Sequence, residues 1–130
     1  MTISTSLRRA VFVLTALVMA PILGAATPFH LRLEKSSPAD SSVVAPPTSV
    51  KLWFTQETQL PVTRVVVRSA AGDTMPVGAP TRAAAPDSPI DVPFKSAVGP
   101  GAYTVDWRTM AADGHVVRGT FRFTVRDATR

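Results

Sequence analysis

The chain has 130 residues, no cysteine and a formal net charge of +5, from 14 Lys and Arg against 9 Asp and Glu. The absence of cysteine excludes thiolate catalysis, disulfides and cysteine-ligated zinc or iron–sulfur sites. The basic residues are scattered along the sequence and form no run of the kind that follows a phosphate backbone, so we expect no nucleic-acid partner.

The first 26 residues have the pattern of a secretory signal peptide. Arg8 and Arg9 precede an apolar run over residues 10–20, and small residues follow at 24–26. The run is shorter than the roughly 20 residues that span a bilayer, although a retained membrane anchor is the alternative interpretation. We expect cleavage after Ala26, export of residues 27–130 as one domain, and no membrane span in that mature chain.

Alternating apolar and polar residues predict a β-protein. The alternation is clear in four segments, with two shorter candidates, and 11 of the 12 prolines follow residue 26, which argues against long helices. Residues 75–89 are rich in Pro and Ala and are predicted to connect two strands. Short strands separated by Pro and Gly turns indicate an all-β sandwich or small barrel. The four segments are residues 48–56, 62–69, 102–110 and 118–127, and the shorter candidates are 30–35 and 90–94.

The two histidines are the residues that point to chemistry. His115 follows Asp113 with one glycine between them, and residues two apart in an extended chain point to the same side. Together with His30 they would supply two imidazoles and a carboxylate, a set that suits copper(II) and is also acceptable to zinc. The same Asp-Gly-His tripeptide is also an ordinary hairpin turn, in which Asp accepts backbone N–H bonds and Gly takes a positive φ.

Five short motifs resemble the CopC family of periplasmic copper-resistance and copper-trafficking proteins. They are HLRL at 30–33 with SPAD at 37–40, VKLWFTQ at 50–56, GAYTVDWR at 101–108, ADGH at 112–115 and GTFRFTV at 119–125. The resemblance implies an immunoglobulin-like Greek-key sandwich of about seven strands. It also implies a periplasmic protein that binds one copper(II) ion through His30, Asp113 and His115, and a separate membrane copper transporter of the CopD kind as a partner.

The sequence departs from the family pattern at the N-terminus. In the family the histidine is typically the first mature residue, so that its α-amine and imidazole bind copper together. Here cleavage after Ala26 leaves three residues before His30, and Pro28 among them has no amide N–H. We therefore expect weaker binding than in members with an N-terminal histidine. Met75 and Met110, the two methionines after residue 26, lie far apart in sequence and predict no thioether site for copper(I).

Two other function classes remain as alternatives. The same sandwich without metal would be an interaction module, for which the internal position of His30 is an argument. A copper-brace oxidative enzyme would use an N-terminal histidine and a broad substrate face. We expect no enzyme activity, because the sequence offers no base–nucleophile pair beyond the metal candidates.

Overall fold

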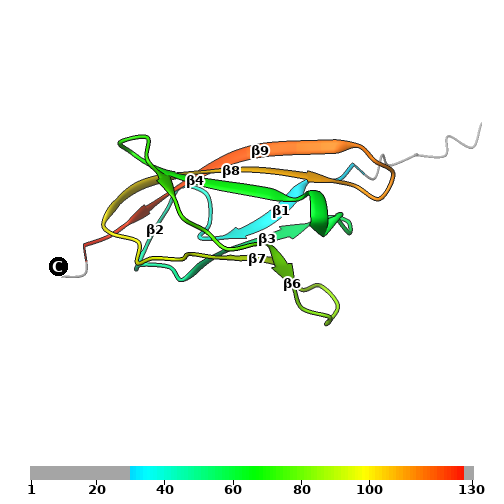
Figure 1. Cartoon of the computed structure of the whole chain (residues 1–130), viewed down its shortest axis with the longest axis horizontal. Helices are drawn as coiled ribbons and strands as arrows, with labels where there is room; N and C mark the ends of the chain where they lie inside the picture. The colour runs from blue at the N-terminus through cyan, green and yellow to red at the C-terminus, as the bar shows by residue number, and fades with distance from the viewer. Residues whose placement is uncertain (1–29, 128–130) are drawn as a thin grey trace, which may run out of the picture.

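The computed structural model describes residues 30–127, which form two facing β-sheets (Figure 1). The expected signal peptide and its cleavage site after Ala26 lie outside the described residues. Within residues 30–127 there is no α-helix, and a single 3₁₀ turn, η1, spans Leu60–Val62. The same part of the chain contains no helix with the length and hydropathy needed to cross a membrane.

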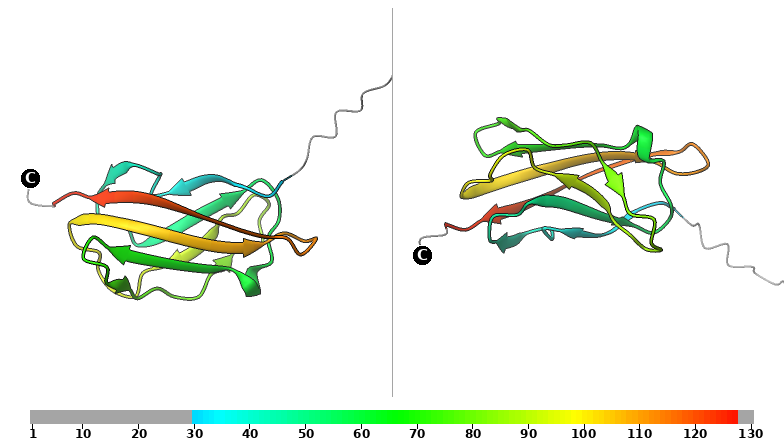
Figure 2. Two further views of the ribbon diagram at one scale, coloured as in Figure 1. Left: turned by 90° about the horizontal axis from the view of Figure 1, so that it is seen from above. Right: turned by 60° about the horizontal axis from the view of Figure 1, so that its bottom comes forward.

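One sheet has four strands in the order β1-β3-β7-β6, and the other has five in the order β2-β9-β8-β4-β5. The pairs within them are antiparallel except for β2 and β9, which run parallel. Figure 2 shows the two layers from two further directions. The strands of the first sheet are β1 (Leu33–Ser37), β3 (Ser49–Phe54), β7 (Ile90–Pro93) and β6 (Thr81–Arg82); those of the second are β2 (Ser42–Val44), β9 (Val116–Val125), β8 (Gly101–Met110), β4 (Arg64–Ser69) and β5 (Thr74–Met75).

The prediction of an all-β sandwich is confirmed, with corrections to the number and the bounds of the strands. Nine strands form within residues 30–127 rather than about seven, because β2, β5 and β6 have only two or three residues and are too short for an alternating pattern to reveal. The expected connection at 75–89 therefore contains β6, and it starts in β5. The strand expected from Val62 begins at Arg64, because η1 spans Leu60–Val62. The strands expected over 30–35 and 118–127 span Leu33–Ser37 and Val116–Val125.

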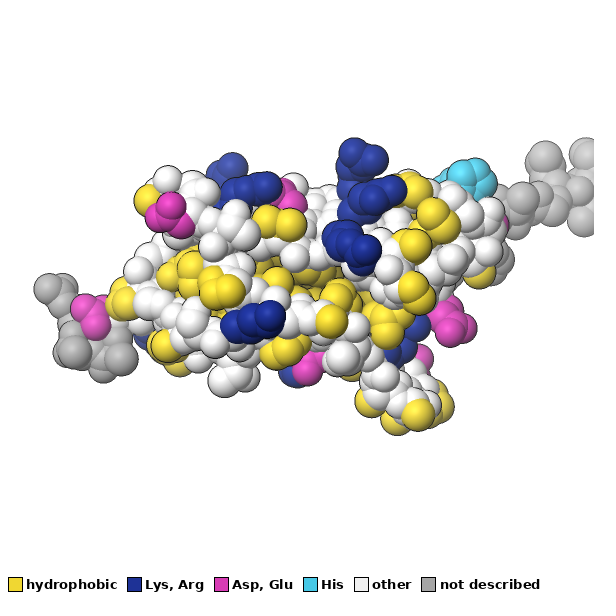
Figure 3. Space-filling model, in the orientation of Figure 1, with side chains coloured by type: hydrophobic (Ala, Val, Ile, Leu, Met, Phe, Trp, Pro, Cys, Tyr) yellow, Lys and Arg dark blue, Asp and Glu magenta, His cyan; other side chains and the backbone are white. Residues whose placement is uncertain are grey.

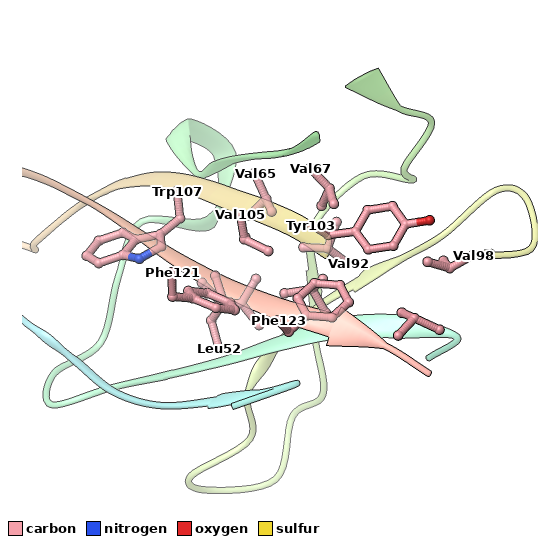
Figure 4. Packing of buried hydrophobic residues seen from close by; sticks show 13 residues of the cluster. Leu52, Val65, Val67, Val92, Val98, Tyr103, Val105, Trp107, Phe121 and Phe123 are labelled. Atoms are coloured by element: carbon pink, nitrogen blue, oxygen red, sulfur yellow. The ribbon is translucent and has the colours of Figure 1, made fainter. Parts of the chain in front are cut away.

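The core is formed by the inward side chains of the long strands. Tyr103, Val105 and Trp107 of β8 face inward, as their alternation with polar residues predicts, and so do Phe121 and Phe123 of β9 (Figure 4). The rings of Tyr103 and Phe123 stack at 5.5 Å between centroids. Burying large aromatic and branched side chains from both sheets is the main stabilising contribution, roughly 1.5–3 kcal/mol for each fully buried side chain.

The position of the Trp107 indole requires a glycine on the neighbouring strand β9. Gly119 is the register partner of Trp107, and a Cβ added there would lie 2.5 Å from the ring. The ring therefore occupies the space that any other residue's side chain would fill. On its other side it meets Phe54 of β3 edge-on at 5.1 Å, so Trp107 links the two sheets near the end where the β8–β9 loop lies.

Candidate metal centre

Asp113 and His115 lie together in the short loop between β8 and β9. The loop is closed by backbone bonds from Ala111 N to the His115 carbonyl at 2.9 Å and from Gly114 N to the Ala111 carbonyl at 3.0 Å. Gly114 has φ +89°, a conformation that glycine adopts without a steric cost. The two longest strands of the molecule therefore carry this loop as a rigid mount, as the sequence predicts.

The Asp113 carboxylate contacts His115 through both of its oxygens. Oδ1 accepts a hydrogen bond from the His115 backbone N–H at 3.0 Å, and Oδ2 lies 2.8 Å from Nδ1 of the imidazole. An ionised carboxylate only accepts hydrogen bonds, so Nδ1 carries the proton. The other ring nitrogen, Nε2, is then left as the electron-pair donor, and the side chain is 84% exposed.

This contact shifts the pKa of both groups. The hydrogen bond that the imidazole donates to the Asp113 carboxylate raises the pKa of His115, and the negative charge of the carboxylate adds to the effect. The side-chain hydrogen bond from His115 lowers the pKa of Asp113, helped by the bond from the His115 backbone. Both groups are exposed, so the pair is a surface feature open to a ligand from solvent.

His30 is attached to the segment between β3 and β4 that crosses from one sheet to the other. Thr55 donates its hydroxyl to the His30 carbonyl at 3.1 Å, and the Arg32 N–H donates to the same hydroxyl at 3.1 Å. Thr55 N donates in turn to the Arg32 carbonyl at 3.0 Å. The backbone of the first described residues is therefore fixed to the start of this crossover.

The same crossover holds the β8–β9 loop. Thr58 forms a β-bridge with Ala111, and the side-chain amide of Gln59 donates to the Ala111 carbonyl at 2.9 Å. Gln59 N also donates to the Met110 carbonyl at 2.9 Å. Thr55 and Thr58 are three residues apart, at most about 11 Å of extended chain, so the backbones of His30 and of the loop are anchored at one end of the sandwich. Figures 1 and 2 show the first described residues and the β8–β9 loop at the same end of the molecule.

The structure brings together two of the three predicted ligands as a preformed pair. Asp113 and His115 are in contact, whereas His30 shares their end of the molecule with its side chain exposed to solvent. Among residues 30–127 no three His, Cys, Asp or Glu side chains are arranged around a common metal position. The assignment of His30 as the third ligand stays a prediction.

The donor types fit the proposed ion. Neutral imidazole nitrogen with carboxylate oxygen suits copper(II), and zinc accepts the same atoms. A carboxylate bound to the second nitrogen of a histidine is also the usual arrangement behind a metal-ligating imidazole, because it fixes the ring and raises its basicity. Asp113 can therefore serve the metal as a direct ligand or by orienting His115.

The two residues that sequence reasoning missed are Thr55 and Gln59. Neither belongs to a recognisable metal-binding motif, yet their side chains hold the backbones of His30 and of the β8–β9 loop. Their roles depend on which strands lie next to each other, and neighbouring residues in the sequence do not indicate this.

Known proteins resemble this chain in sequence over most of its length. The CopC domain model matches residues 33–126. Copper resistance protein C of Xanthomonas campestris pv. juglandis is 31% identical over 119 residues, covering 86% of this chain and 93% of that protein. Protein YobA of Escherichia coli strain K12 is 27% identical over 122 residues, covering 93% and 95%.

Two solved structures have the same fold. The crystal structure of PcoC, a methionine-rich copper resistance protein from Escherichia coli, superposes with a TM-score of 0.66 at 24% identity, covering 75% of this chain and 99% of PcoC. CopC from Methylosinus trichosporium OB3b gives a TM-score of 0.64 at 27% identity, covering 76% and 96%. The match of the domain model over residues 33–126, together with these relatives, shows that the chain belongs to the CopC family.

Proposed function

We propose that this protein binds one copper(II) ion in the periplasm and serves copper resistance or trafficking as a carrier, without catalysing a reaction. Membership of the CopC family and its copper-resistance relatives support a role in copper resistance. The observation that carries the binding proposal is the Asp113–His115 contact at 2.8 Å, which leaves Nε2 of an oriented imidazole facing solvent.

The proposed site has His115 and Asp113 as its preformed half and His30 as its third member. Thr55 holds the His30 backbone at the end of the sandwich where the β8–β9 loop lies, and His30 is exposed. In this proposal the His30 imidazole turns toward the loop when copper binds. Copper is the cargo in this proposal, and a separate membrane copper transporter would receive or supply it.

The proposal is tested by copper(II) titration of the metal-free protein, followed by EPR. We expect a stoichiometry of one, loss of the site in His115→Ala and a large loss of affinity in Asp113→Ala. Asp73→Asn is the matched control, since Asp73 lies in the β4–β5 turn and its removal changes the net charge equally. Wild-type titrations for both His115→Ala and Asp113→Ala would refute the assignment.

The same experiment separates the alternatives. A protein that shows no copper(II) signal at all would favour an interaction module that binds no metal. Copper-dependent turnover with ascorbate would favour an oxidative enzyme and would overturn the carrier proposal.

A further inference from the structure

Three arginines form one row across the outer face of the five-stranded sheet. Arg108 of β8 is the register partner of Arg64 on β4 and of Arg118 on β9. Side chains directly opposite each other on antiparallel strands have Cβ atoms about 4.5–5.5 Å apart, so the row places three positive charges within roughly 10 Å. Figure 3 shows a column of basic side chains over this sheet.

No carboxylate within residues 30–127 neutralises this row. Arg64 donates to two backbone carbonyls, those of Pro61 at 3.1 Å and Thr63 at 2.9 Å. In that part of the chain the side chains of Arg108 and Arg118 make no hydrogen bond or ion pair. The nearest acidic group on this face, Asp106, is already bound by Arg68 and accepts from Thr120 at 2.7 Å.

The row borders a hollow in the sheet surface. The hollow has a volume of about 330 Å³, and the three arginines line it together with Val66, Asp106 and Thr120. Like charges directly opposite on paired strands destabilise a sheet, so this arrangement does not help the fold. It does offer guanidinium groups that form paired hydrogen bonds with carboxylates.

The row lies next to the candidate metal centre. Arg108 and Arg118 are each two residues from the last pair of the hairpin, Met110 and Val116, which is about 7 Å along the strands. The loop with Asp113 and His115 follows directly. A partner that binds the row would therefore be close to the copper-binding end of the molecule.

We propose that Arg64, Arg108 and Arg118 form a docking surface for an acidic segment of a partner protein that exchanges copper with this chain. The basic surface is inferred from the three charges and the hollow. Its role in copper exchange rests on the proposed function. Charge complementarity favours carboxylates, because guanidinium pairs with them in a planar, two-bonded geometry and such pairs speed encounter between partners.

The test uses a hexa-aspartate peptide as the probe, with the metal-free protein at low and at physiological salt. We expect binding that weakens with salt and that falls about tenfold or more, equivalent to 1.4 kcal/mol, in Arg108→Gln/Arg118→Gln. Arg64 is left unchanged, since its bonds to Pro61 and Thr63 hold the turn before β4. The matched control, Arg122→Gln/Arg126→Gln, removes the same charge from the far part of β9 and from the residue that follows this strand, and it should bind the peptide nearly as wild type does.

The melting temperature and the copper(II) titration of the double variant show whether a loss of peptide binding is due to misfolding. The Arg108→Gln/Arg118→Gln variant should melt at the wild-type temperature or above it, and it should titrate copper(II) as wild type does. Equal losses of peptide binding in the two double variants would mean that only net charge matters and would overturn the proposal. Binding to phosphatidylglycerol vesicles without binding to the peptide would overturn it as well, in favour of a membrane surface. Copper titration of the same samples reports separately on the proposed function.

Discussion

At the scale of single residues, the contact between Asp113 and His115 would make the proposed copper binding depend on pH. Only the neutral imidazole donates an electron pair to a metal, so a bound proton competes with copper. Asp113 raises the pKa of His115, and this competition therefore starts at a higher pH than for an isolated histidine. We expect the apparent copper(II) affinity to fall as pH drops through the raised pKa, as measured by titrations between pH 8 and pH 5.

The same contact also makes the stability of the fold depend on pH, and at His115 the direction is opposite to that of copper affinity. A raised pKa of His115 means that the contact stabilises the folded state below the ordinary pKa of histidine, and that this contribution is lost as pH rises through the raised value. The lowered pKa of Asp113 contributes stability above its ordinary pKa of 3.8, which is lost as pH falls through the lowered value. The contact therefore stabilises the fold most between the ordinary pKa of Asp113 and the ordinary pKa of His115. In this pH range copper would have to compete with the proton on His115.

NMR titration of the His115 ring tests this account in the metal-free protein. In Asp113→Asn the pKa of His115 should fall toward its ordinary value of 6.5, because the carboxylate that raises it is gone. Asp73→Asn is the control and should leave the titration of His115 unchanged. An unchanged pKa in Asp113→Asn would show that the two side chains do not interact in solution.

At the scale of elements, Gly119 is needed for the packing of β8 against β9. An alanine there would place its Cβ 2.5 Å from the Trp107 ring, so the ring or the strand must shift. Overpacking of this kind costs about 1–3 kcal/mol, and we expect Gly119→Ala to lower the free energy of unfolding by that amount in urea denaturation. Gly99→Ala is the control, because a Cβ added at Gly99 meets no atom within 4 Å. Equal stability of the two variants would contradict the packing account.

Gln59 connects the crossover between β3 and β4 to the β8–β9 loop. Gln59→Ala removes the bond from its side-chain amide to the Ala111 carbonyl and keeps the backbone bond from Gln59 N to Met110. One such bond contributes about 0.5–1.5 kcal/mol, so we expect a loss of stability of that size and faster hydrogen exchange at Gly114 N. Ser88→Ala removes a comparable bond to the Ala85 carbonyl and should leave the exchange at Gly114 unchanged.

The sequence predicted the strands of four residues or more and missed those of two or three, for a physical reason. In β8 and β9 apolar and polar residues alternate over several positions, so Trp107 and Phe121 could be placed inside and Asp106 and Arg122 outside. In β5 and β6, with two residues each, there is no alternation to read. These strands exist because β4 and β7 offer backbone partners, and such pairing is a tertiary effect.

The candidate site shows the same division. The turn chemistry of Asp113, Gly114 and His115 is local, and the expected Asx bond and positive φ are both present. The anchoring of His30 through Thr55 and the row of arginines depend on which strands are neighbours. Arg64, Arg108 and Arg118 are scattered in the sequence, and only the strand register collects them.

At the scale of the whole molecule, the position of the mature N-terminus would set how many donors the proposed copper site has. Cleavage after Ala26 would leave His30 as the fourth residue, with its imidazole but without the α-amine beside it. A variant that begins at His30 should bind copper(II) about tenfold more tightly or better, because amine and imidazole then chelate together. Intact mass of the exported protein establishes the natural start, and titration of both forms measures the difference. Equal affinities would show that the amine does not join the site.

The central feature of the proposed site is that His30 and His115 bind the same copper ion. The most direct measurement is the count of imidazole nitrogens on bound copper(II), by pulsed EPR of the wild-type protein and of His30→Ala with one equivalent of copper. We predict two imidazoles in the wild-type protein and one in His30→Ala. A single imidazole in the wild-type protein, with an unchanged spectrum in His30→Ala, would contradict the account.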